Sequence, residues 1–116
     1  MNPSDRDRLY VQHIEDRIVR IEGIAAQGRN AFDASYILQD AVIRSFEVIG
    51  EAAKHLSADR KARYPDIPWR RVAGFRDILI HNYMGVDLDE VWNVIDNELP
   101  RLKETILAMR QEIQNA

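Results

Sequence analysis

The sequence of residues 87–114 is DLDEVWNVIDNELPRLKETILAMRQEIQ. Its apolar side chains recur at alternating steps of four and three residues, which is the spacing of one face of an α-helix. Asp87 is a good N-cap, and Glu90 three residues later completes a capping box. A helix of this length needs neighbouring helices to cover its apolar face, so the stretch predicts a helical bundle. The apolar stripe consists of Leu88, Trp92, Ile95, Leu99, Leu102, Ile106, Met109 and Ile113.

The rest of the chain has the same character, because its few Gly and Pro residues fall mostly between long periodic segments. Pro100 lies inside the last predicted helix and should kink it, since proline cannot donate the helical hydrogen bond to Asp96. Residues 1–116 therefore predict one all-α domain, an antiparallel bundle of four main helices plus a short helix. We expect the helices at residues 4–28, 34–56, 57–64 (the short one), 68–83 and 87–114, with Ser4 as the first N-cap.

Composition excludes several classes of protein. The chain has no cysteine, which rules out disulfides and thiolate metal sites, and it has no apolar run long enough to span a membrane. The N-terminal residues are charged and do not form the apolar core of a signal peptide. We therefore expect a cytoplasmic protein. The net charge of −3 argues against broad, nonspecific binding of nucleic acid, so an RNA site would have to be a local patch.

The predicted helix at residues 34–56 carries a second, polar stripe of mixed charge. One interpretation is a solvated face with weak ion pairs between adjacent turns. The other is a polar wall that faces a cleft or a second subunit. Arg70, in the predicted helix at residues 68–83, could belong to the same cleft or interface. Gly50 lies inside this helix, where glycine often indicates close approach by another helix. The polar stripe consists of Asp40, Arg44, Glu47, Glu51 and Lys54.

Residues 76–83 place a cation, a carboxylate, an imidazole and a phenol close together, on Arg76, Asp77, His81 and Tyr83. If the helix continues through this stretch, Asp77 lies one turn before His81 on the same face. A carboxylate that holds a histidine, beside an arginine that can bind phosphate, suits phosphodiester chemistry. The simpler interpretation is a helix end with ordinary polar side chains, where His81 interacts favourably with the helix dipole.

Other catalytic motifs are missing from the sequence. It contains no P-loop, no GxGxxG and no HExxH motif, and no serine occupies a nucleophile elbow. The histidines, His13, His55 and His81, have no metal-ligand spacing. We therefore expect no cofactor and no metal, and any catalysis must come from Arg, His, Tyr and carboxylate side chains.

Several motifs together resemble one known family. Arg76-x4-His81-x-Tyr83 is similar to the Arg-x4-His-x-Tyr motif of HepT-type HEPN toxins. The segment at residues 46–53, FEVIGEAA, resembles the Ile-Gly-Glu-Ala helix of that family. Ile67-Pro68-Trp69, followed by Phe75-Arg76-Asp77, resembles its approach to the motif. The resemblance covers nearly the whole chain in order, without a large insertion.

The resemblance implies a HEPN-like fold and a metal-independent ribonuclease toxin of a type VII toxin–antitoxin pair. It further implies a homodimer that brings two Arg–His motifs to a shared cleft. The implied partner is a nucleotidyltransferase antitoxin of the MntA type, which transfers AMP to the motif tyrosine, here Tyr83, and silences the toxin.

Chemistry assigns roles within this motif. His81 has a side chain that titrates near neutral pH and can move protons, while Arg76 can bind phosphate and stabilise developing negative charge. Asp77 could orient the ring of His81. Two other hypotheses remain open. The chain could be a non-catalytic HEPN companion that binds a nucleotide or substrate beside a nucleotidyltransferase, or a dimeric helical adaptor.

Overall fold

The computed structural model describes residues 2–81 and 85–115. Apart from two strands of two residues each, all regular structure within these ranges is helical, which confirms the expected all-α class. The elements are α1 (Pro3–Ala25), α2 (Arg29–Asp33), α3 (Tyr36–His55), α4 (Ala58–Ala62), α5 (Trp69–Ala73), α6 (Phe75–Leu79), β1 (Ile80–His81), β2 (Gly85–Val86), α7 (Leu88–Asn97) and α8 (Leu99–Asn115).

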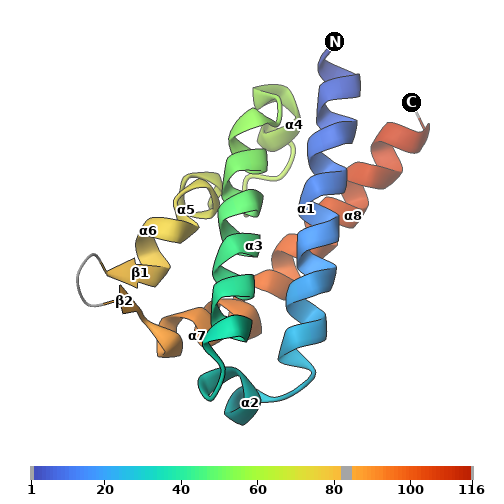
Figure 1. The fold of residues 1–116 in the computed structure, drawn as a ribbon. Helices are drawn as coiled ribbons and strands as arrows, with labels where there is room; N and C mark the ends of the chain where they lie inside the picture. The colour runs from blue at the N-terminus through green and yellow to red at the C-terminus, as the bar shows by residue number, and fades with distance from the viewer. Residues whose placement is uncertain (1, 82–84, 116) are drawn as a thin grey trace.

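The long helices α1 and α3 lie side by side and run in opposite directions (Figure 1). Ser35 begins α3 by accepting a hydrogen bond from the backbone N–H of Leu38 at 3.2 Å. Ser4 was wrongly predicted as the cap of α1. Pro3 opens that helix instead, because a first-turn proline needs no backbone N–H, and Asn2 accepts the bond from Asp5.

The predicted helix at residues 68–83 is wrong, because two short helices and a strand occupy this range. Gly74 separates α5 from α6 with non-helical angles, φ −102° and ψ 17°. At Ile80 the backbone becomes extended, and Ile80 and His81 pair antiparallel with Val86 and Gly85. Gly85 lies in β2 with φ +81°, a conformation that favours glycine.

The predicted last helix is divided in two. Asp87 caps α7, and its side chain accepts from the backbone N–H of Glu90 at 3.1 Å, which confirms the cap. The helix is interrupted at Glu98, two residues before Pro100. Since Pro100 cannot donate to the carbonyl of Asp96, the chain turns here, and α8 passes behind α1 in Figure 1.

The core lies between α1, α3 and α8 and beneath α5 to α7. The apolar residues Val72, Phe75 and Leu79 of α5 and α6 are buried in it. Gly50 of α3 confirms the expected close approach: a Cβ atom there would lie 2.9 Å from the carbonyl oxygen of Ala73. The α5 backbone therefore rests directly on α3.

A buried polar network joins α1, α4 and α8. Asp7 is only 1% exposed, and its carboxylate accepts from the backbone and hydroxyl of Ser57, both at 2.8 Å, and from Arg60 at 3.1 Å. Arg60 also donates to Glu112 at 2.9 Å, and Glu112 accepts from the hydroxyl of Tyr64. Burial, the bond to Glu112 and its negative charge raise the pKa of Tyr64 to about 12. The network positions α4 against both ends of the chain.

Within the described ranges, none of the helices is long and apolar enough to cross a membrane.

Candidate active site at the contact between α3 and α6

Arg76 is placed beside α3 by a pair of buried aromatic rings. Phe46 and Phe75 meet edge to face with ring centroids 5.2 Å apart, and both are almost fully buried. The next residue in each helix is charged, and Nε of Arg76 lies 3.2 Å from Oε2 of Glu47. The apolar contact thus brings a carboxylate and a guanidinium together at the surface above it.

The side chain of Arg76 is available to a ligand while Glu47 holds it. It is 61% exposed, whereas Glu47 is 32% exposed. An ion pair this exposed adds little to folding stability. Its effect is to orient the guanidinium, whose remaining N–H groups can bind the oxygens of a phosphate.

The structure alters the expected arrangement of Asp77 and His81. Because α6 ends at Leu79 and the backbone is extended at Ile80, His81 does not lie one helical turn above Asp77. Asp77 is exposed on α6. The backbone of His81 lies in β1, as the register partner of Gly85. The side chain of His81 and the whole of Tyr83 lie outside the described residues.

The residues of the polar stripe on α3 make two different kinds of contact. Glu47 contacts Arg76, as described above. Glu51 forms ion pairs within the helix, with Lys54 at 3.5 Å and His55 at 3.7 Å. Asp40 and Arg44 are exposed, as is Arg70 on α5. The stripe is therefore partly a solvated face and partly the wall of the Arg76 site.

Arg71 of α5 and Arg60 of α4 have structural roles. Arg71 donates to both carboxylate oxygens of Glu98, at 2.6 and 2.7 Å, and to Glu90 at 3.1 Å. The hydrogen bond to Glu98 is the main cause that raises the pKa of Arg71. Arg60 belongs to the buried network with Asp7. Arg71 thus links α5 to Glu90 of α7 and to Glu98, and Arg60 links α4 to α1 and α8.

The structure also shows a cluster of three rings from α1 and α3 that the sequence did not predict. Tyr10 of α1 stacks on His55 at the end of α3, with centroids 4.9 Å apart, and meets His13 edge to face at 5.7 Å. Spacing within α1 relates Tyr10 to His13, but nothing local relates either residue to His55, more than forty positions later. Only the packing of α1 on α3 unites them.

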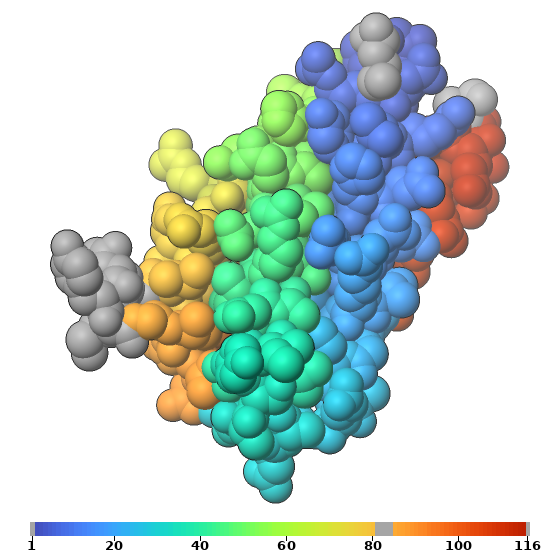
Figure 2. Space-filling view, in the orientation of Figure 1, coloured from blue at the N-terminus to red at the C-terminus, as the bar shows by residue number. Residues whose placement is uncertain are grey.

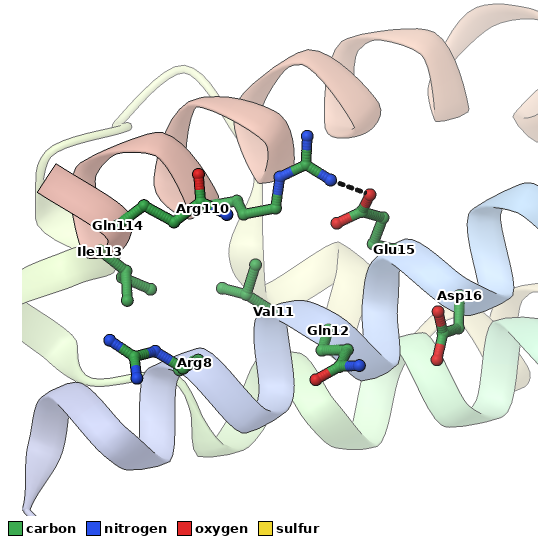
Figure 3. A pocket seen from close by; sticks show the side chains of 8 residues that line it. All are labelled: Arg8, Val11, Gln12, Glu15, Asp16, Arg110, Ile113 and Gln114. Atoms are coloured by element: carbon green, nitrogen blue, oxygen red, sulfur yellow. Dashed lines mark hydrogen bonds and ion pairs between the residues drawn. The ribbon is translucent and has the colours of Figure 1, made fainter.

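A hollow lies between α1 and α8 (Figure 3). Its volume is about 380 Å³, and its apolar floor is formed by Val11 and Ile113. Arg110 forms an ion pair with Glu15 at its rim. Among the described side chains, no group of three or more His, Asp or Glu residues could hold a metal ion.

The described residues thus form an almost entirely helical fold, and the arginine held by Glu47 is the first residue of the sequence motif Arg76-x4-His81. The chain belongs to the family described as Ribonuclease HepT-like, which matches residues 14–109. The family named from the sequence motif is therefore confirmed.

Three relatives show how the similarity is distributed. A "Probable ribonuclease HepT" of Thermococcus cleftensis is 45% identical, over 90% of this chain and 98% of its own length. A "Putative RNase" of Caldanaerobacter subterraneus subsp. tengcongensis is 36% identical, over 90% of this chain and 95% of its own. A "Gamma-glutamylcyclotransferase and putative RNase" of Methanocaldococcus jannaschii is 43% identical over 91% of this chain. The match covers 48% of that larger protein. No solved structure matches the chain.

Proposed function

We propose that this protein is a toxin that cuts RNA without a metal ion and is silenced by AMP transfer to Tyr83. The observation that carries the proposal is the exposed Arg76, held by Glu47 in a chain of the HepT-like ribonuclease family. The names of its relatives support RNA as the substrate class.

The proposed reaction is attack by a ribose 2′-oxygen on the adjacent phosphorus. The bond from phosphorus to the 5′-oxygen breaks, which leaves a 2′,3′-cyclic phosphate and a 5′-hydroxyl end. His81 takes or supplies a proton, because imidazole titrates near neutral pH. Arg76 stabilises the additional negative charge on the phosphate. One histidine cannot easily serve both oxygens, so a homodimer that contributes two His81 side chains suits the chemistry.

Asp77 has a more restricted part in this proposal. The helical spacing that placed it beneath His81 does not hold, as described above, so its role rests on its position next to Arg76 in sequence. Asp77→Asn tests that role directly. An orienting carboxylate predicts a shift in the pH dependence of kcat, whereas a merely solvated side chain predicts none.

The proposed regulation uses the same charge. A nucleotidyltransferase antitoxin would transfer AMP from ATP to the phenolic oxygen of Tyr83, with release of pyrophosphate. The attached AMP is a bulky anion that would compete with RNA phosphate for the guanidinium of Arg76. Intact mass with peptide mapping, after expression with and without such a partner, tests this. An unmodified Tyr83 in both samples would contradict the regulation.

The decisive test of the reaction is RNA cleavage with EDTA present. The unaltered protein should produce cyclic phosphate ends, and Arg76→Ala and His81→Ala should each abolish them. Arg101→Ala, which removes an exposed arginine of α8, is the control and should cleave normally. If RNA stays intact while a nucleotide or the partner binds with Arg76 dependence, the chain is instead a non-catalytic binding companion of a nucleotidyltransferase.

A further inference from the structure

A groove lies in the seam between α1 and α3. Its volume is about 240 Å³, and Tyr10, His13, Arg44, Glu47 and Glu51 are among the residues that line it. Glu47 is also the ion-pair partner of Arg76, so the groove and the site share a wall. Figure 2 shows α1 and α3 side by side on the face presented there.

One end of this groove is lined by the aromatic rings of Tyr10 and His13. Tyr10 is half-buried between His13 and His55, and both histidines are exposed. Three rings from two helices therefore meet at one end of the seam. Rings of this kind are the surfaces on which proteins stack unpaired bases, since every base has a flat face.

The acidic groups that line the groove already have partners. Arg44 also lines it, and Arg17 and Arg20 follow Tyr10 and His13 at helical spacing, which places them farther along the same face of α1. Glu47 pairs with Arg76, and Glu51 pairs with residues of its own helix. In contrast, no ion pair within the described ranges joins a carboxylate to Arg44, or to Arg17 and Arg20 of α1. Among the described residues, the seam thus keeps three arginines without an ion pair, on a protein of net negative charge.

These arginines are close enough to affect one another. Burial lowers the pKa of Arg17, and the positive charges of Arg20 and Arg44 lower it further, while Asp16 opposes the effect. Like charges gathered in this way disfavour one another until an anion binds between them.

We infer that the seam between α1 and α3 binds a single-stranded stretch of the RNA whose scissile phosphate lies at Arg76. Arg44, Arg17 and Arg20 contact successive backbone phosphates, and an unpaired base stacks on the rings around Tyr10. The strand is single because a base within a duplex has no free face for stacking. This inference rests on the proposed function, since it extends the substrate from the same site.

The test measures binding apart from cleavage. The probe is a fluorescent 2′-O-methyl RNA oligonucleotide, which lacks the attacking hydroxyl and stays intact, and binding is followed by anisotropy across a range of salt concentrations. The groove variant is R17Q/R20Q/R44Q. The matched control is R6Q/R8Q/R101Q, which removes three exposed arginines without a described ion pair, so net charge changes equally.

For three phosphate contacts, the slope of log K against log salt should become shallower by about 2 in the groove variant. The control should keep the slope of the unaltered protein. Tyr10→Leu should weaken binding by about 5- to 100-fold with the slope unchanged, because stacking is lost and charge is not. Equal weakening in both triple variants would overturn the inference.

Two further measurements distinguish a failure of this inference from a failure of the proposed ribonuclease function. The groove variant should cleave a ribodinucleotide as the unaltered protein does and lose efficiency only on longer RNA; equal loss on both substrates would overturn the groove. Light scattering must give it the unaltered mass, because a changed oligomeric state would identify the seam as a protein interface instead. If the unaltered protein binds the probe through these arginines but cleaves no RNA, the proposed reaction fails and the groove stands.

Discussion

Replacing Gly50 with alanine tests the contact between α3 and α5, which supports the position of Arg76 in the candidate active site. The new Cβ would lie 2.9 Å from the carbonyl oxygen of Ala73 and 3.0 Å from that of Val72. Both are backbone atoms, so relief requires α5 to move by several tenths of an ångström. Overpacking of this kind costs about 1–3 kcal/mol, against a helix-propensity gain of about 1 kcal/mol. We expect net destabilisation of up to about 2 kcal/mol.

Gly23→Ala is the matched control, because Gly23 also lies within a helix but has no atom within 4 Å of its Cβ position. The propensity gain is common to both variants. The difference in their unfolding free energies therefore isolates the clash, at about 1–3 kcal/mol. Urea unfolding followed by circular dichroism, at one fixed protein concentration, measures it. If Gly50→Ala proves as stable as Gly23→Ala, α5 does not rest on α3 and the positioning of Arg76 needs another explanation.

Three further predictions concern the polar groups. Asp7→Ala leaves the buried Arg60 without its main partner and should cost about 3–5 kcal/mol in urea unfolding, whereas exposed Asp5→Ala should cost about 1 kcal/mol or less. The raised pKa of Tyr64 stabilises the fold below pH 10, so stability should fall as the pH rises from 10 to 12, and Tyr64→Phe should flatten that fall. Glu47→Gln should leave unfolding unchanged within about 1 kcal/mol but lower kcat for RNA on the order of tenfold through loss of orientation; faster cleavage would show that the carboxylate competes with phosphate.

Much of the fold follows from local pattern. Helical spacing of apolar residues identified the buried face of α8, and capping chemistry located the start of α7 at Asp87. These features were predictable because periodicity and caps depend only on residues within a few turns of one another. The hairpin of β1 and β2 was missed, since strands of two residues leave no periodic pattern.

The sequence by itself determined the family, the all-α class and the identity of the candidate catalytic residues, because the motif around Arg76 is contiguous. The glycine at position 50 also indicated that another helix would approach closely there. Only the tertiary structure decided what that neighbour is and that Glu47, twenty-nine positions before Arg76, holds the guanidinium. The same holds for the rings around Tyr10 and for the buried pair of Asp7 and Arg60. Such contacts depend on which helices pack against each other, and the spacing of residues within one helix does not predict that packing.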